Sequence, residues 1–141
     1  VEGAEPGRIA DVNGVKIELV VRGVCCLRPG ISGLSENITV RSIIGRFLEH
    51  SRVYNFGPND EVVYAASADW MSRNLFRRVE TCFPVLDPGL KARVTEECLD
   101  IPLSDNVQAW QLQPDGTWLR GKPQDAAPLA SQEVLMSRLG G

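Results

Sequence analysis

The spacing of hydrophobic positions changes several times in the first half of the chain, and each change predicts an element. Residues 15–21 alternate apolar and polar side chains, the period-2 pattern of a β-strand that ends at Arg22. Residues 27–39 collect Pro, Gly, Ser and Asn, which predicts a loop. The following apolar residues recur at intervals of three and four, which predicts an amphipathic helix ending near Glu49; they are Val40, Ile43, Ile44, Phe47 and Leu48.

Three short apolar runs predict strands in the middle of the chain, at residues 53–56, 62–66 and 79–85, with a turn between the first two. The run at 62–66 is continuously apolar, which is typical of a strand covered on both faces. Asp87 followed by proline is a typical helix start, because the carboxylate can cap free amides and proline suits the first helical position. A helix is therefore expected over about 88–99.

A β-hairpin is predicted around the Pro-Asp-Gly turn at 114–116. Its strands would cover 107–112 and 117–119, so that Trp110 and Trp118 could pair across it. Strands that alternate with helices predict an α/β layered domain with a mixed sheet flanked by helices. We expect one such domain over 1–120, followed by a linker and a short C-terminal helix within 121–141.

The composition is that of a globular protein. The chain has 141 residues, 43% of them hydrophobic and 23% charged, with a net charge of −3. Between Arg22 and Arg78, however, the sequence holds eight arginines and no lysine against five Asp or Glu residues. Arginine binds phosphate oxygens in pairs, whereas lysine acts as a point charge, so this bias is compatible with a phosphate ligand. Such a bias is more often that of a solvated surface.

Cysteine and histidine give little support for a metal site. The four cysteines form no CxxC pair and the chain has one histidine, so we expect no zinc and interpret the cysteines as buried, reduced thiols. No apolar run approaches the roughly 20 residues that span a bilayer, and no signal-peptide pattern is present at the N-terminus. A cytoplasmic protein is the expectation, with association with a membrane surface as the alternative.

The residues best suited to chemistry lie at the ends of predicted elements. His50 and Arg52 are two apart at the start of an extended segment, so their side chains should face the same side. Ser67 and Asp69 have the same spacing after the next strand and could hold the second nitrogen of the imidazole. With Arg22 at another strand end, such a cluster suits phosphoryl transfer, in which catalysis is mostly positioning and stabilisation of negative charge.

Two long segments resemble the last domain of polyphosphate kinases: RGVCCLRPGISGLSENITVRSIIGRFLEHSRVYNFG at 22–57 and YAASADWMSRNLFRRVETCFPVLDP at 64–88. The similarity continues to about Arg120. The resemblance implies a phospholipase D-like fold that is truncated at its N-terminus. It also implies reversible transfer of the terminal phosphate of ATP to inorganic polyphosphate, through a phosphohistidine carried by a preceding domain.

By position in these motifs, the resemblance makes Arg22 and His50 the groups that bind the phosphates of the nucleotide, with Arg52 as a weaker candidate. Ser67 and Asp69 would support them. The magnesium ligands and the phosphate-accepting histidine would lie outside this chain, so the chain alone is expected to be inactive. The implied partners are ATP or ADP, polyphosphate and the remaining domains of a homo-oligomeric protein, with no nucleic acid and no transmembrane segment.

Two alternatives remain open at this point. Phospholipase D-like hydrolases carry an HxK motif with a later Asp and a GSxN segment; here 50–52 reads His-Ser-Arg, Gly57 stands in the place of the Asp, and 66–69 reads Ala-Ser-Ala-Asp. A phosphodiesterase that pairs two copies of His50 is therefore the first alternative. A non-catalytic module that binds polyanions through its arginines is the second.

We interpret Trp70, like the hairpin tryptophans, as a packing residue.

Overall fold

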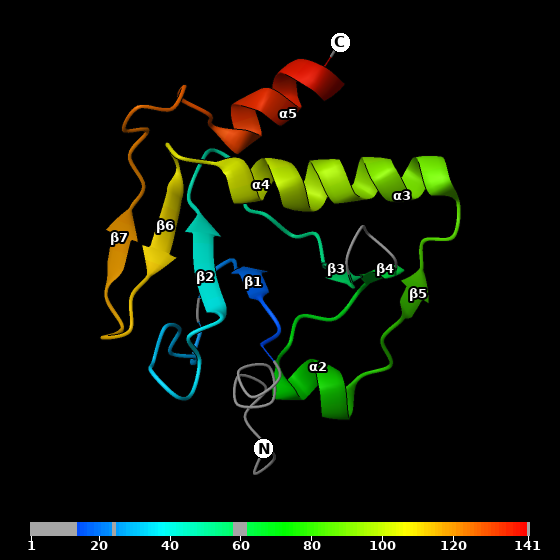
Figure 1. The fold of residues 1–141 in the computed structure, drawn as a ribbon. Coiled ribbons are helices and arrows are strands. Elements are labelled where there is room, and N and C mark those ends of the chain that lie inside the picture. Colours follow the sequence, from blue (N-terminus) through cyan, green and yellow to red (C-terminus); the bar gives the residue numbers. More distant parts are fainter. Residues whose placement is uncertain (1–13, 24, 58–61, 141) are drawn as a thin grey trace. The chain divides into compact units, whose positions relative to one another are not determined.

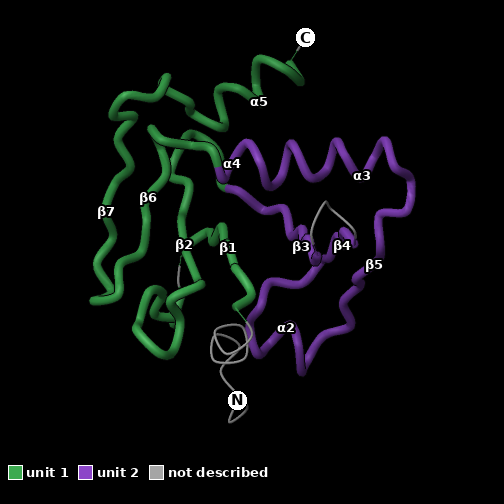
Figure 2. Tube along the Cα trace, viewed as in Figure 1, with its two compact units in different colours: residues 1–48, 104–141 green, residues 49–103 purple. Residues whose placement is uncertain are grey.

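The computed structural model describes residues 14–23, 25–57 and 62–140 (Figure 1). The chain divides into two compact units, which are coloured separately in Figure 2. Unit 1 consists of residues 1–48 and 104–141, and unit 2 of residues 49–103. Each unit contains its own β-sheet with helices, so the expected α/β class with a mixed sheet is confirmed.

Unit 1 is built on a four-stranded sheet in the order β1-β2-β6-β7. Strands β1 (Ile17–Val20) and β2 (Ile38–Ile43) are parallel, whereas β2 and β6 (Ala109–Leu112), and then β6 and β7 (Trp118–Arg120), are antiparallel. The sheet is therefore mixed. Its core is a cluster of buried side chains from the two central strands, namely Ile38, Val40 and Leu112.

The helix predicted to end near Glu49 is wrong, because its first residues form strand β2. Ile38 and Val40 alternate into the core and are 2% and 1% exposed. The β-branched residues of this segment favour an extended chain, and its pairing with β1 and β6 supplies the backbone hydrogen bonds. Only the later residues of the supposed helical stripe lie beyond the strand, where Ile44 is 61% and Leu48 is 76% exposed.

The hairpin is confirmed, but the predicted pairing of its tryptophans is wrong. Trp110 lies opposite Arg120, and Trp118 lies opposite Leu112. The turn fixes this register, since Gln113 accepts a hydrogen bond from Gly116 and donates one to Thr117. The two tryptophans are thus diagonal neighbours and not a directly opposed pair.

Asp105 ties the C-terminal helix of unit 1 to the hairpin. Its Oδ1 accepts hydrogen bonds from the backbone N–H groups of Val107, Gln108 and Ala109 at 2.9, 2.6 and 2.9 Å. Its Oδ2 accepts the N–H of Ser131 at 2.7 Å, at the first residue of α5 (Ser131–Leu139). One carboxylate therefore organises the start of β6 and the start of α5.

Gln132, on the same helix, binds the segment that follows β2. Its side-chain Nε2 donates to the carbonyl of Phe47 at 2.8 Å, and its Oε1 accepts the N–H of Phe47 at 2.9 Å. Gln132 is 3% exposed, so this pair of hydrogen bonds is shielded from water. The amide packs against Gly45, where a Cβ atom would overlap the Gln132 side chain.

Unit 2 contains a three-stranded antiparallel sheet in the order β3-β4-β5, formed by β3 (Val53–Phe56), β4 (Val62–Ala66) and β5 (Cys82–Pro84). All three strands are confirmed, although β5 is shorter than expected; most of the predicted turn at 57–60 lies outside the described residues. Helix α2 (Ser72–Arg77) connects β4 to β5. In Figure 1, α2 and α3 lie on opposite sides of this sheet.

Helix α3 (Pro88–Thr95) starts as predicted, with Asp87 Oδ1 accepting the N–H of Leu90 at 2.8 Å. It continues further than predicted, through a π-helical turn (Glu96–Asp100) into α4 (Ile101–Ser104). Helix α3 packs against β3. Val63, on the helix-covered face of the sheet, is 1% exposed.

Candidate active site

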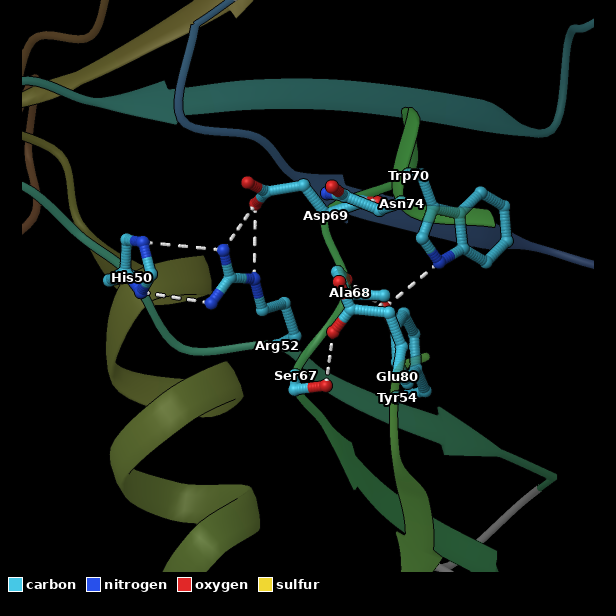
Figure 3. Close-up of polar contacts among 9 residues, drawn as sticks. All are labelled: His50, Arg52, Tyr54, Ser67, Ala68, Asp69, Trp70, Asn74 and Glu80. Carbon is cyan, nitrogen blue, oxygen red and sulfur yellow. Dashed lines mark hydrogen bonds and ion pairs between the residues drawn. The ribbon is translucent and has the colours of Figure 1, made fainter. Parts of the chain in front are cut away.

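His50 and Arg52 lie at the start of unit 2, immediately before β3. The carbonyl of Arg52 accepts the N–H of Ala66 at 2.9 Å, so the β3–β4 ladder begins at Arg52. In an extended chain, alternate side chains point to the same side. The side chains of His50 and Arg52 accordingly meet, as Figure 3 shows.

Asp69 holds the guanidinium of Arg52. Arg52 Nε and Nη2 both approach Asp69 Oδ1, at 3.0 and 2.8 Å. The side chains are 15% and 28% exposed, so this ion pair is largely removed from solvent and from screening by salt. A charge-assisted contact of this kind fixes the plane of the guanidinium.

The other side of the same guanidinium faces His50. Arg52 Nη1 lies 2.9 Å from His50 Nδ1, and Nη2 lies 3.3 Å from Nε2. A guanidinium nitrogen can only donate, so a hydrogen bond in either contact needs an unprotonated ring nitrogen on His50, and which nitrogen accepts depends on the tautomer. With Nδ1 as the acceptor, Nε2 carries the proton and faces Nη2, which is also a donor and cannot accept it.

The expected support of the imidazole by Ser67 or Asp69 takes a different form in the structure. Arg52 lies between Asp69 and His50 (Figure 3). Ser67 donates from its hydroxyl to the carboxylate of Glu80 and accepts the N–H of Thr81 at 3.0 Å. Backbone pairing directs the Ser67 side chain away from His50. The N–H of Ser67 donates to the carbonyl of Thr81 at 3.0 Å, which keeps Ser67 paired with the segment that leads into β5.

The loop that carries Asp69 is held by a buried amide. Asn74, 4% exposed, donates from Nδ2 to the carbonyl of Asp69 at 3.2 Å. Its own backbone N–H binds the carbonyl of Met71 at 2.9 Å. These contacts fix the turn from β4 into α2, and with it the position of the Asp69 carboxylate.

Tyr54 is a residue of this region that the sequence interpretation missed. Burial raises the pKa of the Tyr54 phenol, against the lowering effect of the hydrogen bond from Trp70. Its oxygen accepts the indole N–H of Trp70 at 2.9 Å, and its proton is directed at the carbonyl of Ala68 at 3.5 Å. The i, i+2 spacing from Arg52 would have placed Tyr54 on the same face of the sheet.

Two predicted burial states are wrong. Trp70 is 72% exposed, because it lies on the outside of the loop after β4 and contacts the ring of Tyr54. Of the four cysteines, Cys26 and Cys82 are exposed, while Cys25 and Cys98 are half-buried; all four are free thiols. The exposed cysteines lie at a strand edge and in a loop, where apolar character alone does not enforce burial.

Arg22 belongs to unit 1, whereas the other predicted site residues belong to unit 2. It follows β1 directly, and the N–H of Val21 binds the carbonyl of Arg41 at 2.8 Å, so the parallel pairing extends to the residue before Arg22. The side chain of Arg22 is exposed. The cluster that the structure brings together is therefore Asp69, Arg52 and His50.

Neither a metal centre nor a membrane span is found in the part of the chain that the structure describes. There, no group of three or more His, Cys, Asp and Glu side chains could hold a metal ion. None of the helices within the described ranges is long and apolar enough to cross a bilayer.

Comparisons with known proteins agree with the resemblance in the sequence. The family model described as polyphosphate kinase C-terminal domain 2 matches residues 8–132. A polyphosphate kinase of Pseudomonas putida is 57% identical over 132 residues, which cover 92% of this chain and 18% of that protein. A polyphosphate kinase of Xylella fastidiosa is 52% identical over 133 residues, covering 93% of this chain and 19% of that protein.

The fold is also found in a solved structure. The crystal structure of polyphosphate kinase from Porphyromonas gingivalis matches with a TM-score of 0.87 and 38% identity, over 96% of this chain and 21% of that one. The chain thus spans about a fifth of the length of these relatives. With a family model that matches most of its residues, the chain belongs to the polyphosphate kinase family and corresponds to the C-terminal domain 2 of these proteins.

Proposed function

We propose that this chain is the phosphate-binding part of an enzyme that reversibly transfers the terminal phosphoryl group of ATP to inorganic polyphosphate. The observation that carries the proposal is the Asp69–Arg52–His50 cluster in a member of the polyphosphate kinase family. Phosphoryl transfer needs positioned positive charge and hydrogen-bond donors around the transferring oxygens more than it needs covalent chemistry by the protein.

Arg52 is suited to this role because its orientation is already fixed. Asp69 accepts from Nε and Nη2, which leaves the Nη1 edge towards His50. A phosphate oxygen that approaches this edge can replace His50 Nδ1 as the acceptor. His50 Nε2–H can then donate to the same phosphate, so that guanidinium and imidazole bind one phosphoryl group together. A group oriented in advance does not have to reorganise during the reaction.

Arg22 completes the proposed set. Its side chain is exposed after β1, and its assignment to the nucleotide rests on its position in the family motif. We assign Arg22 and His50 to the β- and γ-phosphates of the nucleotide. In the proposed reaction the γ-phosphoryl group moves from ATP to a histidine nitrogen in a preceding domain, which releases ADP. It then moves to the terminal oxygen of a polyphosphate chain, which becomes one unit longer.

Magnesium belongs to the proposal only as part of the longer protein. The described residues offer no cluster of carboxylates, imidazoles or thiols that could hold the ion. We therefore assign its ligands to the remainder of the polypeptide and derive no step through it. A cytoplasmic, homo-oligomeric enzyme is part of the same proposal.

The test compares this chain with a longer polypeptide of the family that contains it. The longer polypeptide should form ATP from ADP and polyphosphate, and the 141-residue chain alone should not. Hydrolysis of a generic phosphodiester by the chain alone would favour the phosphodiesterase instead. Binding of polyphosphate, RNA and heparin with the same steep salt dependence, and no ATP from the longer polypeptide, would favour a polyanion-binding module.

A further inference from the structure

One face of the sheet in unit 2 carries an open apolar cavity of about 380 Å³. The face is set by alternation and register: Tyr54 and Phe56 of β3 lie on the same side as Tyr64 and Ala66 of β4, and Ala66 lies opposite Cys82 of β5. The loop after β4, helix α2 and the residues just before β5 supply the rest of the wall. The lining residues are Tyr54, Phe56, Tyr64, Ala66, Ala68, Trp70, Leu75, Glu80, Thr81 and Cys82; we call this feature the aromatic groove.

The aromatic rings of the groove form a connected set. The rings of Tyr54 and Trp70 have centroids 5.8 Å apart, and those of Tyr54 and Phe56 are stacked at 6.5 Å. Phe56 meets Tyr64 edge to face at 6.3 Å. The hydrogen bond from Trp70 to the Tyr54 oxygen, drawn in Figure 3, fixes the relative position of the first two rings. The groove is therefore preorganised and apolar.

This surface is more exposed than its sequence leads one to expect. Trp70 is 72%, Phe56 57% and Leu75 54% exposed. The continuous apolar run of β4 is typical of a strand covered on both faces, yet Val62 is 38% exposed on the groove side, while Val63 on the opposite face is 1% exposed. A contiguous apolar surface of this kind marks an interaction site in a soluble protein.

The charges around the groove exclude a phosphate as its occupant. Glu80 is the single charged residue of the lining, and its carboxylate accepts the hydroxyl of Ser67. An anionic ligand would find no arginine or lysine there, whereas the arginine suited to phosphate, Arg52, is bound by Asp69 next to the groove. An apolar partner fits this lining.

We propose that the aromatic groove is the docking surface for an apolar segment of the same polypeptide, from the part that precedes this chain in full-length polyphosphate kinases. The matched region is 18–19% of the curated relatives and is described as a C-terminal domain, so most of their length precedes it. A volume of about 380 Å³ accommodates one or two large apolar side chains. Trp70 and Phe56 are the expected anchors, since aromatic residues dominate the energy of interfaces.

The docking would also bear on the candidate active site. Arg52 and Tyr54 are two residues apart on the same face of the sheet, so a segment seated on Tyr54 is next to the Arg52 guanidinium. The inference rests on the longer polypeptide that the proposed function requires. Its test uses no activity, so its failure is distinguishable from failure of that function.

Cys82, an exposed thiol in the lining of the groove, reports whether the groove is covered. The rate of its alkylation by iodoacetamide is measured by peptide mass spectrometry, in this chain and in the longer polypeptide. Each alkylation rate is divided by the rate for the same cysteine in urea, where the chain is unfolded. The exposed Cys26 of unit 1 is followed in the same samples as an internal reference. We expect alkylation of Cys82 to be about tenfold slower or more in the longer polypeptide.

Variants then identify the anchors. In the longer polypeptide, Trp70→Ala and, independently, Phe56→Ala should restore fast alkylation of Cys82. The matched control Leu119→Ala, at a residue of unit 1 that is 58% exposed, should leave Cys82 protected. Equal alkylation of Cys82 in the chain and in the longer polypeptide would overturn the proposal. Two other results would also overturn it. Slower alkylation of Cys82 in the chain alone at higher chain concentration would indicate that a second copy covers the groove. Slower alkylation of Cys82 in the chain when ATP is added would indicate a nucleotide site.

Discussion

Arg52 donates from both Nε and Nη2 to a single oxygen of Asp69, at 3.0 and 2.8 Å. The carboxylate therefore holds the guanidinium by its Nε–Nη2 edge, and Nη1 faces His50 Nδ1 at 2.9 Å. The sequence separation of 17 residues is bridged because β3 and β4 are antiparallel and each cluster residue lies at an end of this pair. The cluster is small, and each of its members can be tested by substitution.

Asp69→Asn in the longer polypeptide should lower kcat about tenfold or more, because misplacement of a positioning group is costly in phosphoryl transfer. KM for ADP should change less, and Asp69→Glu should recover part of the loss by restoring the charge. Steady-state ATP formation from ADP and polyphosphate gives both constants. The exposed Asp125 provides the control, as Asp125→Asn should match the unmodified protein. Equal kcat in the Asp69 and Asp125 variants would remove Asp69 from the site.

Arg22→Ala should cost on the order of 3 kcal/mol in the barrier, roughly a hundredfold in kcat, if Arg22 stabilises charge on the transferring group. The same assay measures it. Arg28 is an exposed arginine of the same unit, so Arg28→Ala controls for a general loss of positive charge. A loss below about threefold for Arg22→Ala would make it an ordinary surface arginine.

Stability of this chain should depend on Asp105 and on pH. Burial raises the pKa of the Asp105 carboxyl, but the hydrogen bonds from Ser131, Gln108 and Val107 outweigh burial and hold the pKa below its ordinary value. A lowered pKa in the folded state contributes stability that is present above the unfolded pKa of about 3.9 and is lost as pH falls through the folded value.

Asp105→Asn should therefore be less stable by about 1–3 kcal/mol near neutral pH, since buried N–H groups lose a charged acceptor. The difference from the unmodified chain should shrink as the pH falls below about 4. Urea unfolding across this range measures it, with Asp125→Asn as the exposed control. A difference that stays constant with pH would contradict the assigned role of the carboxylate.

Gly45→Ala should destabilise the chain by about 1–3 kcal/mol, the usual cost of overpacking. The new Cβ would lie 2.8 Å from Gln132 Cδ and 2.9 Å from Gln108 Oε1, and would displace the amide that binds Phe47. Gln132→Ala should cost less in the Gly45→Ala background than in the unmodified chain, because one change has already broken the contact. Additive losses in urea unfolding would show that Gly45 and Gln132 are independent.

Strands were predicted well where the local pattern and the tertiary environment agree. The run at 53–56 is a strand because it pairs with β4 on one side and packs against α3. The segment at 38–43 has a misleading local pattern, because apolar residues continue past the strand into exposed positions and imitate a helical stripe. The segment is extended because it pairs with β1 and β6. Both partners are distant in the sequence, so a local hydrophobic pattern cannot reveal this pairing.

The site residues followed partly from spacing and partly from the resemblance. The i, i+2 relation of His50 and Arg52 correctly predicted that their side chains meet. The position of Arg52 between Asp69 and His50 could not be predicted, because it depends on the length of arginine and on the turn held by Asn74. The partner of Ser67 was wrong for a similar reason, since the pairing with Thr81 directs its hydroxyl to Glu80.

We propose that His50 binds the phosphoryl group during transfer, and the most direct test is ATP formation from ADP and polyphosphate by the longer polypeptide with His50→Ala. His50 is the one histidine of this chain. We expect the unmodified protein to make ATP and the variant, with an unchanged melting temperature, to be slower by about tenfold or more. ATP formation at the same rate by both proteins would contradict it.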